Sequence, residues 1–238
     1  KTFCVRNGGS RCLDSRMEDA FVQRLFAQHI DSLQYLEYRA CIVYINGEYR
    51  GLYGLRERAN HTWAENNRGV AEDVAVEVEG FYTDDEAFAP VKALIDSDQA
   101  TYADYCRYLD MPLLLDYLCC QAFATNVLFP HSNVNMWMDP TGDDRRIHPL
   151  LKDLDALAET PASANWYNFI TLTGEEGTWG SSSDDRKIFV RLFALDEFRN
   201  AFIDRMQTYL GDFCKPSVTV PMVVAMRDEI DSEVAATF

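Results

Sequence analysis

The pattern of apolar and polar positions predicts a chain that mixes strands and helices. Alternation with a period of two predicts strands, and apolar residues three or four apart predict helices. The predicted strands are 40–45, 48–57, 74–82, 133–138 and 147–151. The predicted helices are 15–30, 84–95, 113–125, 186–194, 196–210 and 220–236. This pattern favours an α+β fold, and the length of 238 residues suits one domain over residues 1–238.

Local signals define several of these elements further. Asn46-Gly47 lies between two β-rich runs and predicts the type I′ turn of a hairpin. Ser15 and Glu18 have the spacing of a capping box. Asp110 before Pro112 predicts a helix start, and the helix that follows is apolar almost all round, so we expect it at the centre of the fold. Residues 159–184 are rich in Gly, Ser, Thr and Asn and predict a long loop, which could close over a cleft as a lid.

Charge and composition exclude two classes of partner. The chain has 22 Lys and Arg against 38 Asp and Glu, a net charge of −16, which argues against nucleic-acid binding. No apolar run reaches the roughly 18 to 20 residues of a membrane span, so we expect no membrane insertion. The absence of an initiator Met and of a signal peptide suggests a fragment of a longer precursor.

The seven cysteines do not form a metal-binding pattern, because no CxxC pair occurs. Cys119 and Cys120 are adjacent on the predicted central helix, so we expect them as thiols in the core. A disulfide between Cys4 and Cys12 is possible, but spacing alone does not establish it.

The chemistry concentrates in one stretch. A buried helix is followed by a loop, Asn133, a short hairpin and then Asp153-Leu-Asp155. A protein-kinase catalytic centre has the same order of elements, with an Asn and an Asp that hold Mg²⁺. Asn133 and Asp153 fit those two ligand roles, although an Asp-x-Asp after a strand also occurs as an ordinary helix cap.

Several segments resemble the CotH family, a family of kinase-like proteins known from bacterial spore coats and from secreted bacterial and eukaryotic modules. The similar segments are Arg6-Asn-Gly-Gly-Ser10, the helix 16–27, Tyr44 to Arg58, Pro130-His-Ser-Asn-Val-Asn-Met-Trp137, Lys152-Asp-Leu-Asp155 and the helix at 196–202. The hairpin Ile-Asn-Gly-Glu-Tyr with Gly-Leu-Tyr and Arg-Glu is the most specific of them. The similarity covers nearly the whole chain.

This resemblance implies an atypical, two-lobed kinase-like fold, here N-terminally truncated or reduced, with a small lobe at about 1–82 and a mainly helical lobe at about 83–238. It further implies binding of ATP with Mg²⁺ or Mn²⁺, a protein substrate, and a secreted or cell-surface location. By position, Asp153 matches the catalytic metal-binding acid and Asn133 the metal-binding amide. Asp155 is a second acid at the metal, and Glu57 matches a residue on the nucleotide side.

One departure from the family pattern changes the expected activity. The family's catalytic Asp aligns with Leu128, which cannot accept a proton, so we expect weak or lost phosphotransfer. His131 in the same loop can supply a base, although an ordinary loop histidine is the simpler interpretation, and His148 is expected to be structural. Three hypotheses remain: a degenerate kinase that still binds nucleotide, a working kinase that uses His131, and a secreted or cell-surface interaction module without nucleotide binding.

Overall fold

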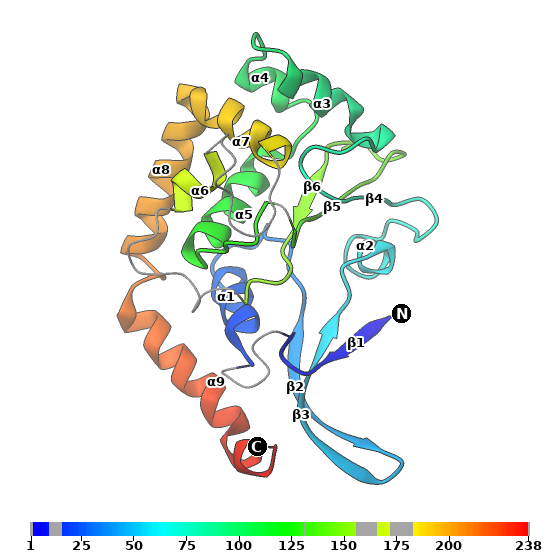
Figure 1. The fold of residues 1–238 in the computed structure, drawn as a ribbon, viewed down its shortest axis with the longest axis vertical. Helices are drawn as coiled ribbons and strands as arrows, with labels where there is room; N and C mark the ends of the chain where they lie inside the picture. Colours follow the sequence, from blue (N-terminus) through cyan, green and yellow to red (C-terminus); the bar gives the residue numbers. More distant parts are fainter. Residues whose placement is uncertain (1, 10–15, 131, 156–165, 172–182, 238) are drawn as a thin grey trace.

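The computed structural model describes residues 2–9, 16–130, 132–155, 166–171 and 183–237, and the statements below refer to these. Figure 1 shows a mixed structure with small sheets beside a larger set of helices. The α+β class predicted from the sequence is therefore confirmed. The elements are β1 (Phe3–Arg6), α1 (Glu18–Ala27), β2 (Tyr38–Ile45), β3 (Glu48–Glu57), α2 (His61–Arg68), β4 (Val76–Val78), the 3₁₀ turn η2 (Glu86–Phe88), α3 (Ala89–Asp96), α4 (Tyr102–Tyr105), α5 (Met111–Phe123), β5 (Asn135–Met138), β6 (His148–Leu150), α6 (Trp166–Thr171), α7 (Ser183–Ala194), α8 (Asp196–Gly211) and α9 (Pro216–Thr237).

The first sheet is antiparallel and has the strand order β1-β3-β2. Its hairpin turns at Asn46 with φ 52° and Gly47 with φ 84°, the two positive values that a type I′ turn requires, so the predicted hairpin is confirmed. The end of the hairpin lies near the C-terminal end of α9 in Figure 1, where the Tyr49 hydroxyl hydrogen-bonds Glu233 at 3.2 Å.

The second sheet is smaller and has the order β4-β5-β6, again antiparallel. β4 is shorter than the predicted strand 74–82, because Gly80 with φ 86° turns the chain soon after it. β4 pairs with β5, so strand pairing crosses the predicted lobe boundary at about residue 82. The division into two lobes stays a prediction.

The centre of the core is α5, as its apolar sequence predicts. Asp110 Oδ1 accepts a hydrogen bond from the Leu113 N–H at 3.3 Å and caps the first turn. Cys119 and Cys120 have no exposed surface. Tyr117 of this helix belongs to a cluster of aromatic rings with Phe81, Phe129, Trp166 and Phe189. Burial of each such ring stabilises the fold by about 1.5 to 3 kcal/mol, so this cluster fixes how the helices pack around α5.

Some predicted boundaries are wrong. α1 begins at Glu18 with Met17 as its N-cap, because Arg16 has φ 58° and cannot belong to a right-handed helix. The expected capping box is therefore wrong as a helix start, and Ser15 itself lies outside the described residues. The predicted long loop at 159–184 contains α6, and α7 already begins at its end.

The described cysteines are free thiols, Cys4 among them, and Cys12 lies outside the described residues. Within the described part of the chain, none of the helices is long and apolar enough to cross a membrane.

Candidate functional site

The loop after α5 and the segment after β6 meet at one backbone carbonyl. The Asn133 side-chain amide donates to the carbonyl oxygen of Asp153 at 2.9 Å, and the Asn126 amide donates to the same oxygen at 3.3 Å. Both ends of the loop 126–133 are thus tied to Asp153. Asn133 with φ 63° and Asp153 with φ 51° both adopt the left-handed conformation that Asn and Asp tolerate best among residues other than Gly. The structure therefore brings together the two residues that the sequence assigns to one metal.

The carboxylates of Asp153 and Asp155 face the same cation, the guanidinium of Arg6 at the end of β1. Arg6 Nη1 forms an ion pair with Asp153 Oδ1, and Arg6 Nη2 donates to Asp155 Oδ2 at 3.2 Å. All three side chains are half-buried, with 31, 27 and 13 % of their surface exposed. The two acids thus form a site that already attracts and holds positive charge.

The backbone of Gly9 packs directly against this ion pair. A Cβ atom at position 9 would lie 2.5 Å from Arg6 Nη2 and 3.0 Å from Asp155 Oδ2. Gly9 also has φ 59°, a conformation that side chains disfavour. A side chain at position 9 would therefore require the Arg6 guanidinium to shift, in a backbone conformation that already favours glycine.

A second ion pair lies next to the first and connects it to α1. Asp19 Oδ1 accepts from the Leu154 N–H at 2.9 Å and from the Gln23 amide at 2.6 Å, and Asp19 Oδ2 forms an ion pair with Arg56 of β3. Arg56 is only 6 % exposed. Burial, together with the nearby positive charge of Arg6, lowers the pKa of Arg56 to about 10. Within the described part of the chain, its Nε and Nη2 atoms have no hydrogen-bond partner.

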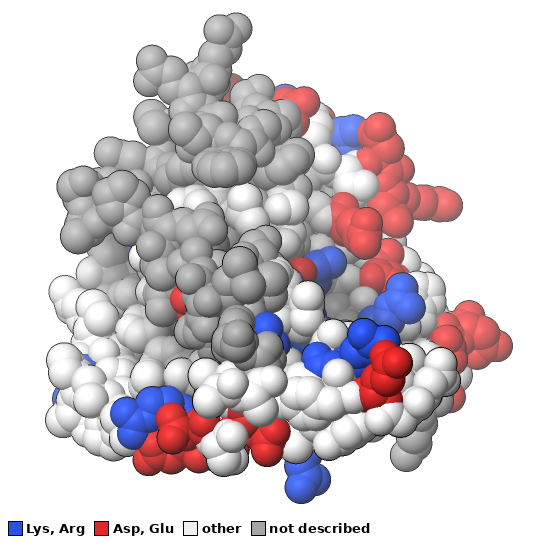
Figure 2. All heavy atoms as spheres, turned by 60° about the horizontal axis from the view of Figure 1, so that its bottom comes forward, with Lys and Arg blue, Asp and Glu red and all other residues white. Residues whose placement is uncertain are grey.

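An open pocket of about 390 Å³ adjoins these residues, a size within the usual range of ligand sites. It lies between the first sheet, β4 and the segment after β6. Its charged lining residues are Arg6, Arg56, Arg58 and Lys152 and, of opposite sign, Glu57, Glu77, Glu79 and Asp153. Figure 2 shows such basic (blue) and acidic (red) side chains beside one another on one face of the molecule. A lining of mixed sign is suited to a ligand that carries both a cation and anionic groups.

The other predicted site residues are less clearly part of this pocket. Glu57 lines the pocket, but its carboxylate accepts hydrogen bonds from the Glu37 N–H at 3.1 Å and from the Asn67 amide at 2.9 Å. Its role toward a nucleotide stays a prediction. His131 lies outside the described residues, so its role as a base also stays a prediction. Leu128 is half-buried within the loop anchored on Asp153.

The sequence alone does not single out Arg6 or Arg56, which form the ion pairs of the candidate site. Arg6 was noted only as the first residue of a family-like segment, and Arg56 only within the hairpin. The signal that could have found Arg6 is the Gly8-Gly9 pair directly after a strand that ends in a cation, since paired glycines there indicate a close backbone approach.

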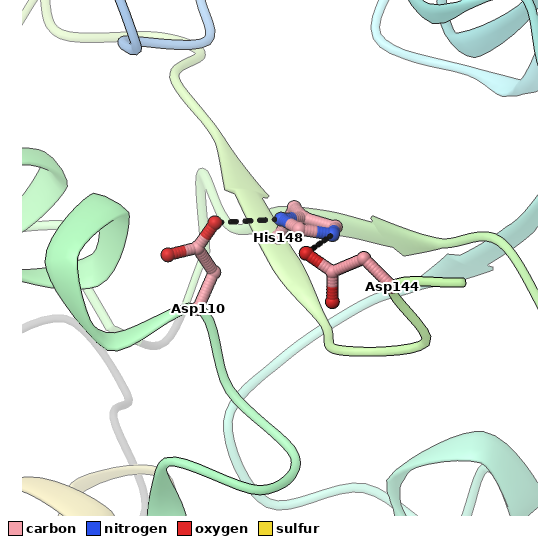
Figure 3. Close-up of side chains that lie close together, drawn as sticks. All are labelled: Asp110, Asp144 and His148. Carbon is pink, nitrogen blue, oxygen red and sulfur yellow. Dashed lines mark hydrogen bonds and ion pairs between the residues drawn. The ribbon is translucent and has the colours of Figure 1, made fainter. Parts of the chain in front are cut away.

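A further group of metal-ligand types lies at the start of α5 and on β6 (Figure 3). His148 Nδ1 lies 3.1 Å from Asp110 Oδ2, its Nε2 lies 3.7 Å from Asp144 Oδ2, and the three potential ligand atoms are within 4.8 Å of one another. Arg146 pairs with both acids, at 2.7 Å from Asp144 and 3.7 Å from Asp110. The guanidinium of Arg146 thus already pairs with both acids, and we interpret the group as a structural cluster.

The pKa directions in this cluster agree with ion pairing. The hydrogen bond from Arg146 lowers the pKa of Asp144 to about 2. Burial opposes ionisation of Asp110, but hydrogen bonds from His148 and from the Leu113 N–H lower its pKa overall. Both carboxylates are thus charged at neutral pH, and the structural role expected for His148 agrees with its contacts.

Comparison with known proteins supports the family resemblance. The sequence profile of the family described as CotH kinase protein matches residues 82–238. No match was found among curated proteins. The matched range is well over half of the chain and contains Leu128, Asn133, Asp153 and Asp155. The chain therefore belongs to the CotH family of kinase-like proteins.

Proposed function

We propose that this chain is a kinase-like domain that binds ATP with Mg²⁺ or Mn²⁺ and transfers phosphate weakly or not at all. The observation that carries the proposal is the meeting of Asn133 with Asp153, at 2.9 Å between amide and carbonyl, next to the carboxylate of Asp155. These residues lie in the matched family range, and Asp153 lines a pocket of about 390 Å³.

The residues present fit a divalent cation. Mg²⁺ and Mn²⁺ prefer hard oxygen ligands, and Asp153 and Asp155 supply carboxylates that already hold a positive charge. The Asn133 amide nitrogen is used by the Asp153 carbonyl, so the amide oxygen is the atom left to act as a ligand. Asn133, Asp153 and Asp155 would hold the metal, which would neutralise charge on the phosphate oxygens.

The chain's own residues divide the remaining work. Arg58 and Lys152 line the pocket and offer positive charge to phosphate oxygens. Leu128 lies in the loop anchored on Asp153 but has no group that can orient or deprotonate a hydroxyl. Loss of a positioned base lowers a rate by about 10² to 10⁴, so binding without efficient transfer is the expected result.

Thermal unfolding with ATP and Mg²⁺ or Mn²⁺ tests the binding proposal. ATP at about 100 times its Kd should stabilise the fold by about 2.7 kcal/mol and raise the Tm. Asp153→Ala should abolish the rise, and Asp144→Ala, which removes an acid from the structural cluster, should keep it. An unchanged Tm of the wild type would overturn the proposal and favour the interaction module without nucleotide binding.

Transfer of labelled γ-phosphate tests the role of Leu128. The wild type should give little labelled protein, and Leu128→Asp should give at least about tenfold more. If the wild type instead transfers phosphate efficiently and His131→Ala does not, the working kinase with His131 as base replaces the degenerate one.

A further inference from the structure

The position of Arg6 suggests how this site changes when a ligand binds. Its guanidinium lies between the carboxylates of Asp153 and Asp155, the two acids that would hold a metal. A divalent cation that binds both acids must therefore displace Arg6, because like charges repel at such distances. The same contact occupies the donors that Arg6 would otherwise offer to an anion.

Within the described residues, the neighbouring Arg56 has hydrogen-bond donors without a partner. Arg56 is only 6 % exposed and lines the same pocket as Arg6 and Asp153. Its Nη1 pairs with Asp19, but within the described residues its Nε and Nη2 atoms have no hydrogen-bond partner. Unpaired donors on a buried cation are costly, and the planar guanidinium is the side chain best suited to pair with phosphate oxygens. Those two nitrogens have almost no accessible surface, so Arg56 adds positive charge beside the pocket, and Arg6 is the arginine whose donors can reach an anion once it leaves the two acids.

We propose that Arg6 is an exchangeable cation: it holds Asp153 and Asp155 until a divalent metal takes them, and it then binds the phosphate oxygens of the same ligand beside Arg56. This inference rests on the proposed function, because it concerns the same site. Its ligand class is a metal–polyphosphate complex. No covalent bond of the protein forms or breaks in the exchange: the metal brings two positive charges to the acids, and the polyphosphate brings the negative charges that Arg6 then pairs with.

The exchange couples two binding events. A metal alone must break the contacts of Arg6 with both acids, and a polyphosphate alone must do the same to reach Arg6. When metal and polyphosphate bind together, Arg6 is released from the acids and pairs with the phosphate in one exchange. Each ligand should therefore raise the affinity of the protein for the other. Removal of the guanidinium should uncouple the two events.

The test measures Mn²⁺ binding by electron paramagnetic resonance, with and without inorganic tripolyphosphate, after correction for Mn²⁺ held by free tripolyphosphate. The variants are Arg6→Gln and a matched control, Arg39→Gln. Arg39 is exposed on β2, and the alternation along the strand puts it on the opposite face of the sheet from Arg56, so the control removes the same charge elsewhere. Circular dichroism checks the fold of each variant.

The expected result is a difference in coupling. Tripolyphosphate should tighten Mn²⁺ binding of the wild type and of Arg39→Gln roughly tenfold, within the usual range of coupling between sites. Arg6→Gln should bind Mn²⁺ alone roughly tenfold more tightly than the wild type and gain nothing from tripolyphosphate. If Arg6→Gln does not fold, Arg6→Lys takes its place. It keeps the charge but cannot bridge both acids, so Mn²⁺ alone should still bind more tightly than to the wild type.

Two outcomes separate this inference from the proposed function. If the arginine variant binds Mn²⁺ no more tightly than the wild type while ATP with Mg²⁺ still raises the Tm, the exchange is overturned and nucleotide binding stands. If tripolyphosphate shows the coupling but ATP does not, the exchange stands and nucleotide binding is overturned. A wild type whose Mn²⁺ affinity is unchanged by tripolyphosphate also overturns the exchange.

Discussion

The molecule contains two clusters in which an arginine pairs with two aspartates, and they differ in what is left unpaired. In the structural cluster, both nitrogens of His148 and the guanidinium of Arg146 face the same two carboxylates. In the candidate site, Arg6 pairs with two acids, but a buried Arg56 with free donors lies beside them and a pocket adjoins. Carboxylates and basic side chains therefore lie close together in a structural cluster as well as in a binding site. Unpaired buried donors next to a pocket distinguish the second.

The largest expected effect concerns the support of the candidate site. Asp19→Ala should lower the free energy of unfolding by about 3 to 5 kcal/mol, because it leaves the buried Arg56 without its counter-ion. Urea unfolding followed by circular dichroism measures the change. Asp19→Asn keeps an acceptor for the Leu154 N–H and should cost less. A cost below about 1 kcal/mol for the alanine variant, as for surface pairs, would contradict the buried pair.

A smaller effect is expected in the structural cluster. Asp110→Ala should lower the free energy of unfolding by about 2 kcal/mol, since it removes the cap of α5 and the hydrogen bond to His148. The same urea titration measures it. The Tm rise with ATP and Mg²⁺ should persist in this variant, and its loss would mean that the two clusters are not functionally separate.

Mn²⁺ affinity should depend on the candidate site and not on the structural cluster. Asp153→Asn should weaken Mn²⁺ binding in the presence of tripolyphosphate by about tenfold or more, which corresponds to about 1.4 kcal/mol. Asp144→Asn makes the same chemical change in the structural cluster and should leave the Mn²⁺ affinity unchanged. Calorimetric titration measures both. Equal weakening in the two variants would contradict the assignment of the metal to Asp153 rather than to the structural cluster.

The smallest effect is a pH dependence. The folded-state pKa of Asp144 is lowered to about 2, below its unfolded value of about 3.9, so its pairing stabilises the fold above about pH 4 and is lost as the pH falls toward 2. Asp144 is 45 % exposed, and solvent screening reduces this contribution to about 1 kcal/mol. Asp144→Asn should therefore be less stable than the wild type at pH 7, and the difference should shrink as the pH falls from 4 toward 2, by urea unfolding at each pH. A difference that stays constant over this range would contradict the ion pair.

Local signals explain which parts of the fold the sequence predicted well. The turn at Asn46-Gly47 and the cap at Asp110 each depend on a few adjacent residues, and both are confirmed. The start of α1 was wrong because nothing local shows that Arg16 adopts φ 58°. Likewise, the predicted strand at 133–138 starts only at Asn135, since Asn133 turns out of the extended conformation to reach Asp153.

The candidate site shows the same division. Asn133 and Asp153 could be singled out because their types and the order of the elements between them resemble a known kind of centre. The pairing of Arg6 with Asp153 could not, because the two are 147 residues apart and the Gly8-Gly9 pair indicates only a close backbone approach near Arg6. The pairing of Asp19 with Arg56 depends in the same way on how α1 packs against the first sheet. Long-range charge pairs follow from the fold and are visible only once the fold is known.

Gly9 gives the chain a position at which size matters more than polarity. The methyl group of an alanine there would lie 2.5 Å from Arg6 Nη2, so even the smallest side chain would push against the guanidinium. In a saturation library selected for ligand capture, position 9 should favour glycine, although Gly9 is only half-buried. A substitution at this turn consequently acts on the one side chain on which the exchange of cations depends.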